Sequence, residues 1–178
     1  MIDKQKFFLI GYMGSGKTTV GKQLARELNL QFMDLDLFIE NRYHKSISAI
    51  FEEKGEAAFR KIERKALMEM LDFENVVIST GGGTPCFFDN IDLMNQSGIT
   101  IYLKVSVDEL VERLKNAKQK RPLIKNKDSE EIKDYITANL GKREQFYNQA
   151  TFIFESNNFF TNENFKDKIE RLIKNIKP

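Results

Sequence analysis

The stretch Gly11-Tyr12-Met13-Gly14-Ser15-Gly16-Lys17-Thr18 decides the fold class of this 178-residue chain. It follows a short apolar run, Phe7–Ile10, that is typical of a buried strand, and it precedes residues 17–28, where apolar side chains recur at helical spacing. The eight residues match the pattern G-x-x-x-x-G-K-[S/T] in the strand–loop–helix context that this pattern requires. Glycines in such a loop let successive backbone N–H groups converge on an anion, and the helix adds its positive end. The motif predicts a phosphate-binding loop.

Lys17 and Thr18 close this motif and extend its chemistry. A lysine here reaches the β- and γ-phosphates of a nucleotide, and the threonine hydroxyl ligates the accompanying magnesium ion. The motif leaves open whether the nucleotide is hydrolysed, transferred to an acceptor or only sensed.

Short apolar runs alternate with helical patterns along the rest of the chain. Strands are expected at 7–10, about 32–33, 76–78, 99–103 and 151–154, and helices at 17–28, 35–43, 56–71, 107–114, 129–146 and 163–176. Parallel strands need crossover connections, so the pattern predicts one α/β domain, 1–178, with a five-stranded parallel sheet between two layers of helices. The polar, lysine-rich segment 115–128 is expected to be a mobile loop.

Composition excludes several classes of protein. A net charge of +2 provides no basic field for nucleic acid, and no apolar run reaches the roughly 18 to 20 residues that span a membrane. The start of the sequence does not read as a signal peptide, so a cytoplasmic location is expected. The one cysteine, Cys86, and the one histidine, His44, exclude an internal disulfide and a histidine-rich zinc site, and neither is expected to be functional. We expect a monomer, because no long apolar surface stripe remains after the core helices are assigned.

Two acidic residues and three glycines follow predicted strands. If the chain is extended at Asp34 and Asp36, both carboxylates point to one side, where one could hold magnesium and the other an acceptor hydroxyl. The alternative is a capped helix start, which aspartate favours. The run Gly81-Gly82-Gly83 lets a ligand approach backbone N–H groups closely, or else forms an ordinary turn.

Three arginines are candidates for binding anions. Arg60 and Arg143 lie on separate predicted helices, and a guanidinium fork suits a substrate carboxylate. Arg121 lies in the lysine-rich loop, from which it could contact a transferring phosphoryl group. Taken alone, each arginine is more typical of a solvated charge, and Arg60 is expected to lie off the buried face of its helix.

Several motifs together resemble the shikimate kinase family over nearly the whole chain. They are Gly11–Thr18, Asp34-Leu35-Asp36, Ser46–Phe51 with Gly55-Glu56 and Phe59-Arg60, Gly81-Gly82-Gly83, Arg121-Pro122-Leu123, and Lys142-Arg143 leading to Tyr147. The resemblance implies a P-loop NTPase fold of the nucleoside monophosphate kinase type, with strand order 2-3-1-4-5. It also implies a substrate-binding helical region at about 34–62 and a lid at about 114–128.

The family's reaction transfers the γ-phosphoryl group of ATP to the 3-hydroxyl of shikimate, on the route to chorismate and aromatic amino acids. By resemblance, the residues that contact ATP are Gly14, Ser15, Gly16, Lys17, Thr18, Thr19, Arg113, which stacks on adenine, and Arg121 of the lid. Those that hold shikimate are Asp36, Arg60, Gly81, Gly82, Gly83 and Arg143. One Mg²⁺ per subunit is held by Thr18 and Asp34, and the catalytic residues are Lys17, Asp36 and Arg121. No base-contacting residue is assigned within 155–158.

Asp36 has two possible roles, as a general base or as a group that positions the acceptor hydroxyl. The arginines expected beside it would stabilise its charged form, so positioning is its larger expected role.

Two other functions compete with this interpretation. A P-loop kinase for gluconate or a nucleoside monophosphate would share the phosphate loop but not the acceptor set Asp36, Arg60, Gly82 and Arg143. A nucleotide-binding switch would release no ADP in response to an acceptor.

Overall fold

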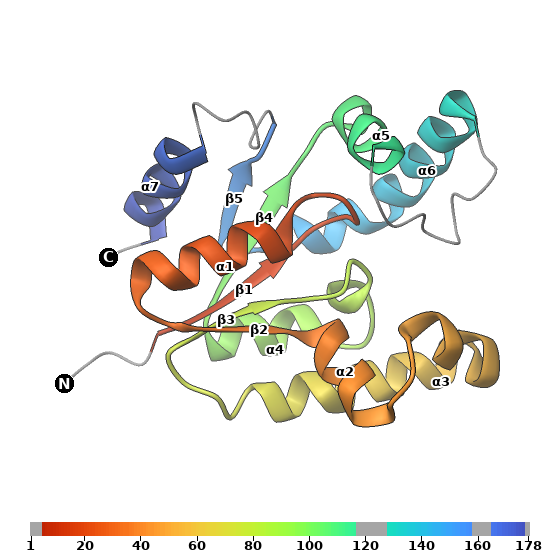
Figure 1. Ribbon diagram of the computed structural model, residues 1–178, viewed down its shortest axis with the longest axis horizontal. Coiled ribbons are helices and arrows are strands. Elements are labelled where there is room, and N and C mark those ends of the chain that lie inside the picture. Colours follow the sequence, from red (N-terminus) through yellow and green to blue (C-terminus); the bar gives the residue numbers. More distant parts are fainter. Residues whose placement is uncertain (1–4, 117–127, 158–164, 177–178) are drawn as a thin grey trace.

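The computed structural model describes residues 5–116, 128–157 and 165–176. Within them, five strands form one parallel sheet in the order β2-β3-β1-β4-β5 (Figure 1). The strands are β1 (Lys6–Ile10), β2 (Gln31–Asp34), β3 (Val76–Ser79), β4 (Ile99–Lys104) and β5 (Phe152–Glu155). The predicted fold class and strand order are confirmed.

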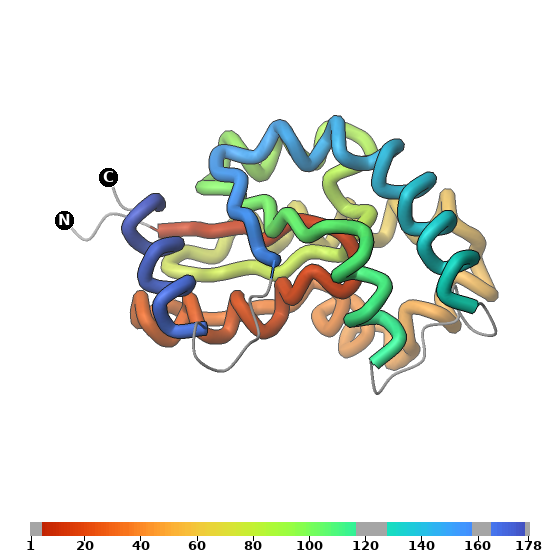
Figure 2. Tube along the Cα trace, turned by 90° about the horizontal axis from the view of Figure 1, so that it is seen from above, coloured from red at the N-terminus to blue at the C-terminus, as the bar shows by residue number. Residues whose placement is uncertain are grey.

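Helices cover both faces of this sheet. They are α1 (Lys17–Leu28), α2 (Leu35–Tyr43), α3 (Ile47–Met70), α4 (Asn90–Ser97), α5 (Val107–Lys115), α6 (Ser129–Tyr147) and α7 (Phe165–Ile176), with a short 3₁₀ helix, η1 (Thr84–Cys86). Figure 2 shows α1 and α7 on one side of the sheet and α4 and α6 on the other. None of the helices in the described part of the chain is long and apolar enough to cross a membrane.

Alternation along the strands divides the core in two. In β1, Phe7 and Leu9 pack with α1 and α7, whereas Phe8 and Ile10 pack with the cluster that includes α3, α4 and α6. Successive side chains of a strand point to opposite faces, so a strand covered on both sides must be apolar throughout. This explains why β1 reads as a continuous apolar run.

One predicted helix needs correction, and one helix was not predicted. The helix expected at 56–71 is the second part of α3, which begins at Ile47, and Gly55 interrupts it with φ 74° and ψ 170°. That left-handed conformation suits glycine, so the kink falls there. Helix α4 was not predicted, because its buried apolar residues, Ile91 and Met94, give only a short helical pattern.

The carboxyl ends of the strands meet at one edge of the sheet. The phosphate loop follows β1, Asp34 ends β2, and Thr80 and the three glycines follow β3. Helix α5 follows β4 shortly afterwards, and Ser156 follows β5. Ligands of open α/β sheets bind at this edge.

Candidate active site

The phosphate loop is tightly folded around the Lys17 side chain. Gly14 and Gly16 have φ values of 81° and 95°, which only glycine adopts without strain. The buried Lys17 Nζ donates hydrogen bonds to the carbonyl oxygens of Gly11 at 2.9 Å and Tyr12 at 3.0 Å. The loop therefore holds the lysine amine against its own backbone, at the start of α1.

Thr18 and Asp34, the residues predicted to hold magnesium, lie within hydrogen-bond distance of each other. The Thr18 hydroxyl donates to Asp34 Oδ2 at 3.0 Å, while Asp34 Oδ1 accepts from the backbone N–H groups of Asp36 at 3.1 Å and Leu37 at 3.3 Å. Asp34 thus caps α2 with one oxygen and faces the phosphate loop with the other. The assumption of an extended chain through Asp36 was wrong, because α2 begins at Leu35 and places Asp36 in its first turn.

A cleft of about 440 Å³ opens beside these residues. Its lining comprises Met13, Gly14, Gly16, Lys17, Thr18, Thr19, Asp34, Asp36, Ser79, Thr80, Gly82, Arg113 and Leu114. Most of the predicted nucleotide and metal residues that the structure describes therefore face one cavity, and Asp36 and Gly82 bring the predicted acceptor site to its wall.

Gly81 and Gly83 pack against charged groups of that acceptor site, whereas Gly82 lies against the backbone of the phosphate loop. A Cβ on Gly81 would lie 2.9 Å from an Asp36 carboxylate oxygen and 2.9 Å from a Glu63 carboxylate oxygen. A Cβ on Gly83 would lie 2.6 Å from Arg60 Nη2. Side chains at these two positions would displace the charges, so close approach explains why both are glycine.

Arg60 is buried, with 8% of its surface exposed, although it was expected off the buried face of its helix. Its Nη1 donates to Glu63 at 2.9 Å, Nη2 donates to Glu56 at 3.0 Å, and its guanidinium lies 4.1 Å from the centre of the Phe87 ring. Glu63 is 1% exposed and also accepts from the Thr84 hydroxyl at 2.6 Å. A buried charge requires such partners, and they fix the guanidinium beside Gly83.

Arg143 reaches the same loop from α6. Its guanidinium lies 5.5 Å from the centre of the Tyr12 ring and interacts with Tyr147, one turn further along the helix. The buried Tyr147 hydroxyl donates to the Gly82 carbonyl oxygen at 2.5 Å. One phenol therefore links the predicted carboxylate-binding arginine to the glycine loop.

Cys86 and His44 differ in their surroundings. Burial raises the pKa of the Cys86 thiol to about 11, against the lowering effect of nearby Arg143 and Arg60. His44 is exposed and ends α2 in a left-handed conformation with φ 52°, as expected of a surface residue near a helix end.

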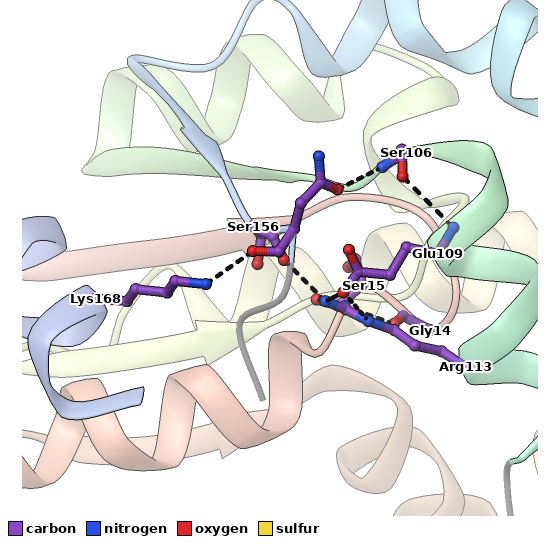
Figure 3. Close-up of polar contacts among 8 residues, drawn as sticks. Gly14, Ser15, Ser106, Glu109, Arg113, Ser156 and Lys168 are labelled. Carbon is purple, nitrogen blue, oxygen red and sulfur yellow. Dashed lines mark hydrogen bonds and ion pairs between the residues drawn. The ribbon is translucent and has the colours of Figure 1, made fainter. Parts of the chain in front are cut away.

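Arg113 lies between the phosphate loop and Ser156 (Figure 3). Its predicted stacking on adenine stays a prediction. Arg121 and most of the predicted lid lie outside the described residues.

Sequence reasoning assigned no role to three residues that hold predicted ones in place. Glu63 follows Arg60 by three positions, Glu109 precedes Arg113 by four, and Tyr147 follows Arg143 by four. Such spacing places two side chains on one helix face, which was the available signal.

Comparisons with known proteins agree with this geometry. The shikimate kinase family model matches residues 13–174. The shikimate kinase of Parabacteroides distasonis is 52% identical over 170 residues, which cover 96% of this chain and 98% of that protein. The crystal structure of shikimate kinase from Bacteroides thetaiotaomicron is similar with a TM-score of 0.93 at 48% identity, covering 96% of this chain and 97% of that one. The structure of shikimate kinase from Acinetobacter baumannii in complex with shikimate is similar with a TM-score of 0.84 at 30% identity. The match covers 97% of this chain and 95% of that one. The chain therefore belongs to the shikimate kinase family.

Proposed function

We propose that this protein transfers the γ-phosphoryl group of ATP to the 3-hydroxyl of shikimate, giving shikimate 3-phosphate and ADP. The observation that carries the proposal is the position of the glycine loop, where Gly82 lines the cleft of the phosphate loop while Arg60 packs on Gly83. A phosphate donor site and a cationic acceptor site thus share one wall.

The acceptor would bind through its carboxylate and its hydroxyls. Arg60 and Arg143 would receive the carboxylate, because a guanidinium offers paired donors to two oxygens. Asp36, which lies against Gly81 and lines the cleft, would accept from the reacting hydroxyl and hold it in line with the γ-phosphate. Alignment and positive charge supply most of the catalysis of phosphoryl transfer, so positioning is its main role.

Lys17 and the loop amides would stabilise charge on the phosphoryl oxygens. The Lys17 amine lies at the loop backbone, and Lys17 lines the cleft in which the phosphates would bind. Arg121 would add charge from the lid at about 114–128; both stay predictions.

Magnesium fits the oxygens of Thr18 and Asp34. A hydroxyl and a carboxylate 3.0 Å apart are hard ligands of the kind that Mg²⁺ prefers, and both line the cleft. When bound, one ion per subunit would neutralise phosphate charge. A cytoplasmic location, a monomeric state and a single domain with a substrate-binding region at about 34–62 also stay predictions.

A coupled assay of ADP release tests this function. Magnesium-ATP is supplied with shikimate, gluconate, a nucleoside monophosphate or no acceptor. ADP release that depends on shikimate alone is expected. Dependence on a different acceptor would reject the substrate assignment, and release without any acceptor dependence would reject the kinase reaction.

A further inference from the structure

The guanidinium of Arg113 joins three segments that are far apart in the sequence (Figure 3). Nη1 donates to the carbonyl oxygens of Gly14 at 3.2 Å and Ser15 at 3.1 Å, and Nη2 donates to that of Ser156 at 2.8 Å. Nε and Nη2 donate to one Glu109 carboxylate oxygen at 3.0 and 2.5 Å. These contacts match the five N–H donors of a guanidinium. The N–H groups along the edges of the Arg113 guanidinium therefore donate hydrogen bonds to oxygens of the protein.

The Ser156 side of this arrangement is itself held firmly. The Ser156 N–H donates to the Lys104 carbonyl oxygen at 2.7 Å, which continues the pairing of β4 and β5. Asn157 accepts from the Ser106 N–H at 2.8 Å through its side chain and from Lys168 Nζ at 2.8 Å through its carbonyl oxygen. Arg113 thus links the phosphate loop to a backbone segment fixed by β4 and α7.

Glu109 sets the direction of the Arg113 side chain. The two residues lie four apart in α5, and their side chains are only 17% and 14% exposed. Shielding from water makes this ion pair stronger than a typical surface pair. Removing the carboxylate would leave two N–H donors without their acceptor and free the guanidinium to turn away from the loop.

The contact to Ser15 acts on a peptide of the phosphate loop. In a planar trans peptide, the C=O of one residue and the N–H of the next point in opposite directions. Fixing the Ser15 carbonyl oxygen on Arg113 therefore fixes the direction of the Gly16 N–H, at the glycine that immediately precedes α1.

We propose that Glu109 is a positioning residue for nucleotide binding, which acts through Arg113 by holding the phosphate loop in its anion-binding shape. The proposal rests on the proposed function in that ATP is the nucleotide. This proposal differs from a role of Arg113 at the adenine base alone. It requires that the binding of a polyphosphate without an adenine base also depend on Glu109.

Isothermal titration calorimetry with magnesium-ADP and with inorganic tripolyphosphate tests the proposal. Glu109→Ala is expected to weaken the binding of both ligands about tenfold or more, the effect of losing a charge-assisted hydrogen-bond pair. The KM for shikimate should stay within about twofold of wild type while the KM for ATP rises. The matched control is Glu112→Ala, which removes an equal charge from an exposed position of the same helix and should leave both affinities unchanged.

Unchanged tripolyphosphate binding by a folded Glu109→Ala variant would overturn the proposal, even if ADP binding fell, because the effect would then lie at the base. If circular dichroism shows that this variant does not fold, Glu109→Gln decides instead. The glutamine keeps an oxygen acceptor but not the charge. The proposal requires that this variant bind tripolyphosphate at least about threefold more weakly than wild type, and a smaller loss would overturn it. If wild-type protein binds tripolyphosphate but releases no ADP from ATP in the presence of shikimate, the proposed function is rejected and the proposal for Glu109 is not.

Discussion

Replacing Gly83 by alanine tests the acceptor site through one added methyl group. Gly83 has φ −89° and ψ −19°, which any residue adopts, so the substitution strains no backbone. The methyl carbon would lie 2.6 Å from Nη2, 2.7 Å from Nη1 and 2.8 Å from Cζ of Arg60. Ordinary contact begins near 3.4 Å, so the guanidinium must move by about 0.8 Å or more.

Arg60 has little freedom to make that movement cheaply. Its buried ion pair with Glu63 and its packing on Phe87 both oppose a shift. A displacement near 1 Å at a substrate-positioning group costs up to about a hundredfold in function. We expect the KM for shikimate to rise about 10- to 100-fold, or about 1.4 to 2.8 kcal/mol, with the KM for ATP unchanged.

Steady-state ADP release at varied shikimate concentration measures this effect. The matched control is Gly141→Ala in α6, where an added methyl group meets nothing within 4 Å. It should leave the kinetics unchanged and stabilise the fold by about 0.5 to 1 kcal/mol. In an Arg60→Ala background, Gly83→Ala should add less than about a twofold change, because its effect passes through the guanidinium. A folded Gly83→Ala variant with the KM for shikimate of wild type would refute the reasoning.

Three further predictions concern neighbouring groups. Tyr147→Phe removes the hydroxyl that donates to the Gly82 carbonyl oxygen, so the free energy of unfolding measured by urea titration should fall by about 1 to 3 kcal/mol. The KM for shikimate should rise while the KM for ATP stays the same. An unchanged KM for shikimate would contradict a link to the acceptor loop. Thr18→Val should raise the Mg²⁺ concentration for half-maximal activity about tenfold or more. Thr137→Val, whose hydroxyl donates to the Lys133 carbonyl oxygen within α6, should not; equal effects would argue against Thr18 as a ligand. Burial raises the pKa of Cys86 from 9.0 to about 11, so its thiol stays protonated at about pH 8. Iodoacetamide should therefore alkylate Cys86 roughly 100-fold more slowly than a free cysteine at about pH 8, and the rate should rise as the pH approaches 11. Comparable alkylation rates at that pH would contradict this prediction.

The buried pairs of the site show where sequence reasoning reaches its limit. Arg60 was expected off the buried face, since a charged residue in a helical pattern counts as exposed unless its partner is known. Its partner Glu63 was visible at helical spacing, but the ring of Phe87 and the surface of Gly83 reach it only after β3 is placed. The link from Tyr147 to Gly82 spans 65 positions, which no local pattern encodes.

The sequence by itself determined the phosphate loop, the alternation of strands and helices, and the parallel sheet, because each depends on residues close together in the chain. Glycine spacing specifies a loop, and apolar periods of two or 3.6 residues specify which faces are buried. The family resemblance supplied the strand order and the residues of the acceptor site. Only the tertiary structure decided that Asp34 serves both as a helix cap and as a partner of Thr18, that Arg60 is buried, and that Arg113 connects the phosphate loop to Ser156. These features depend on side chains that meet across different strands, and their directions are fixed only when the sheet brings the carboxyl ends of those strands to one edge.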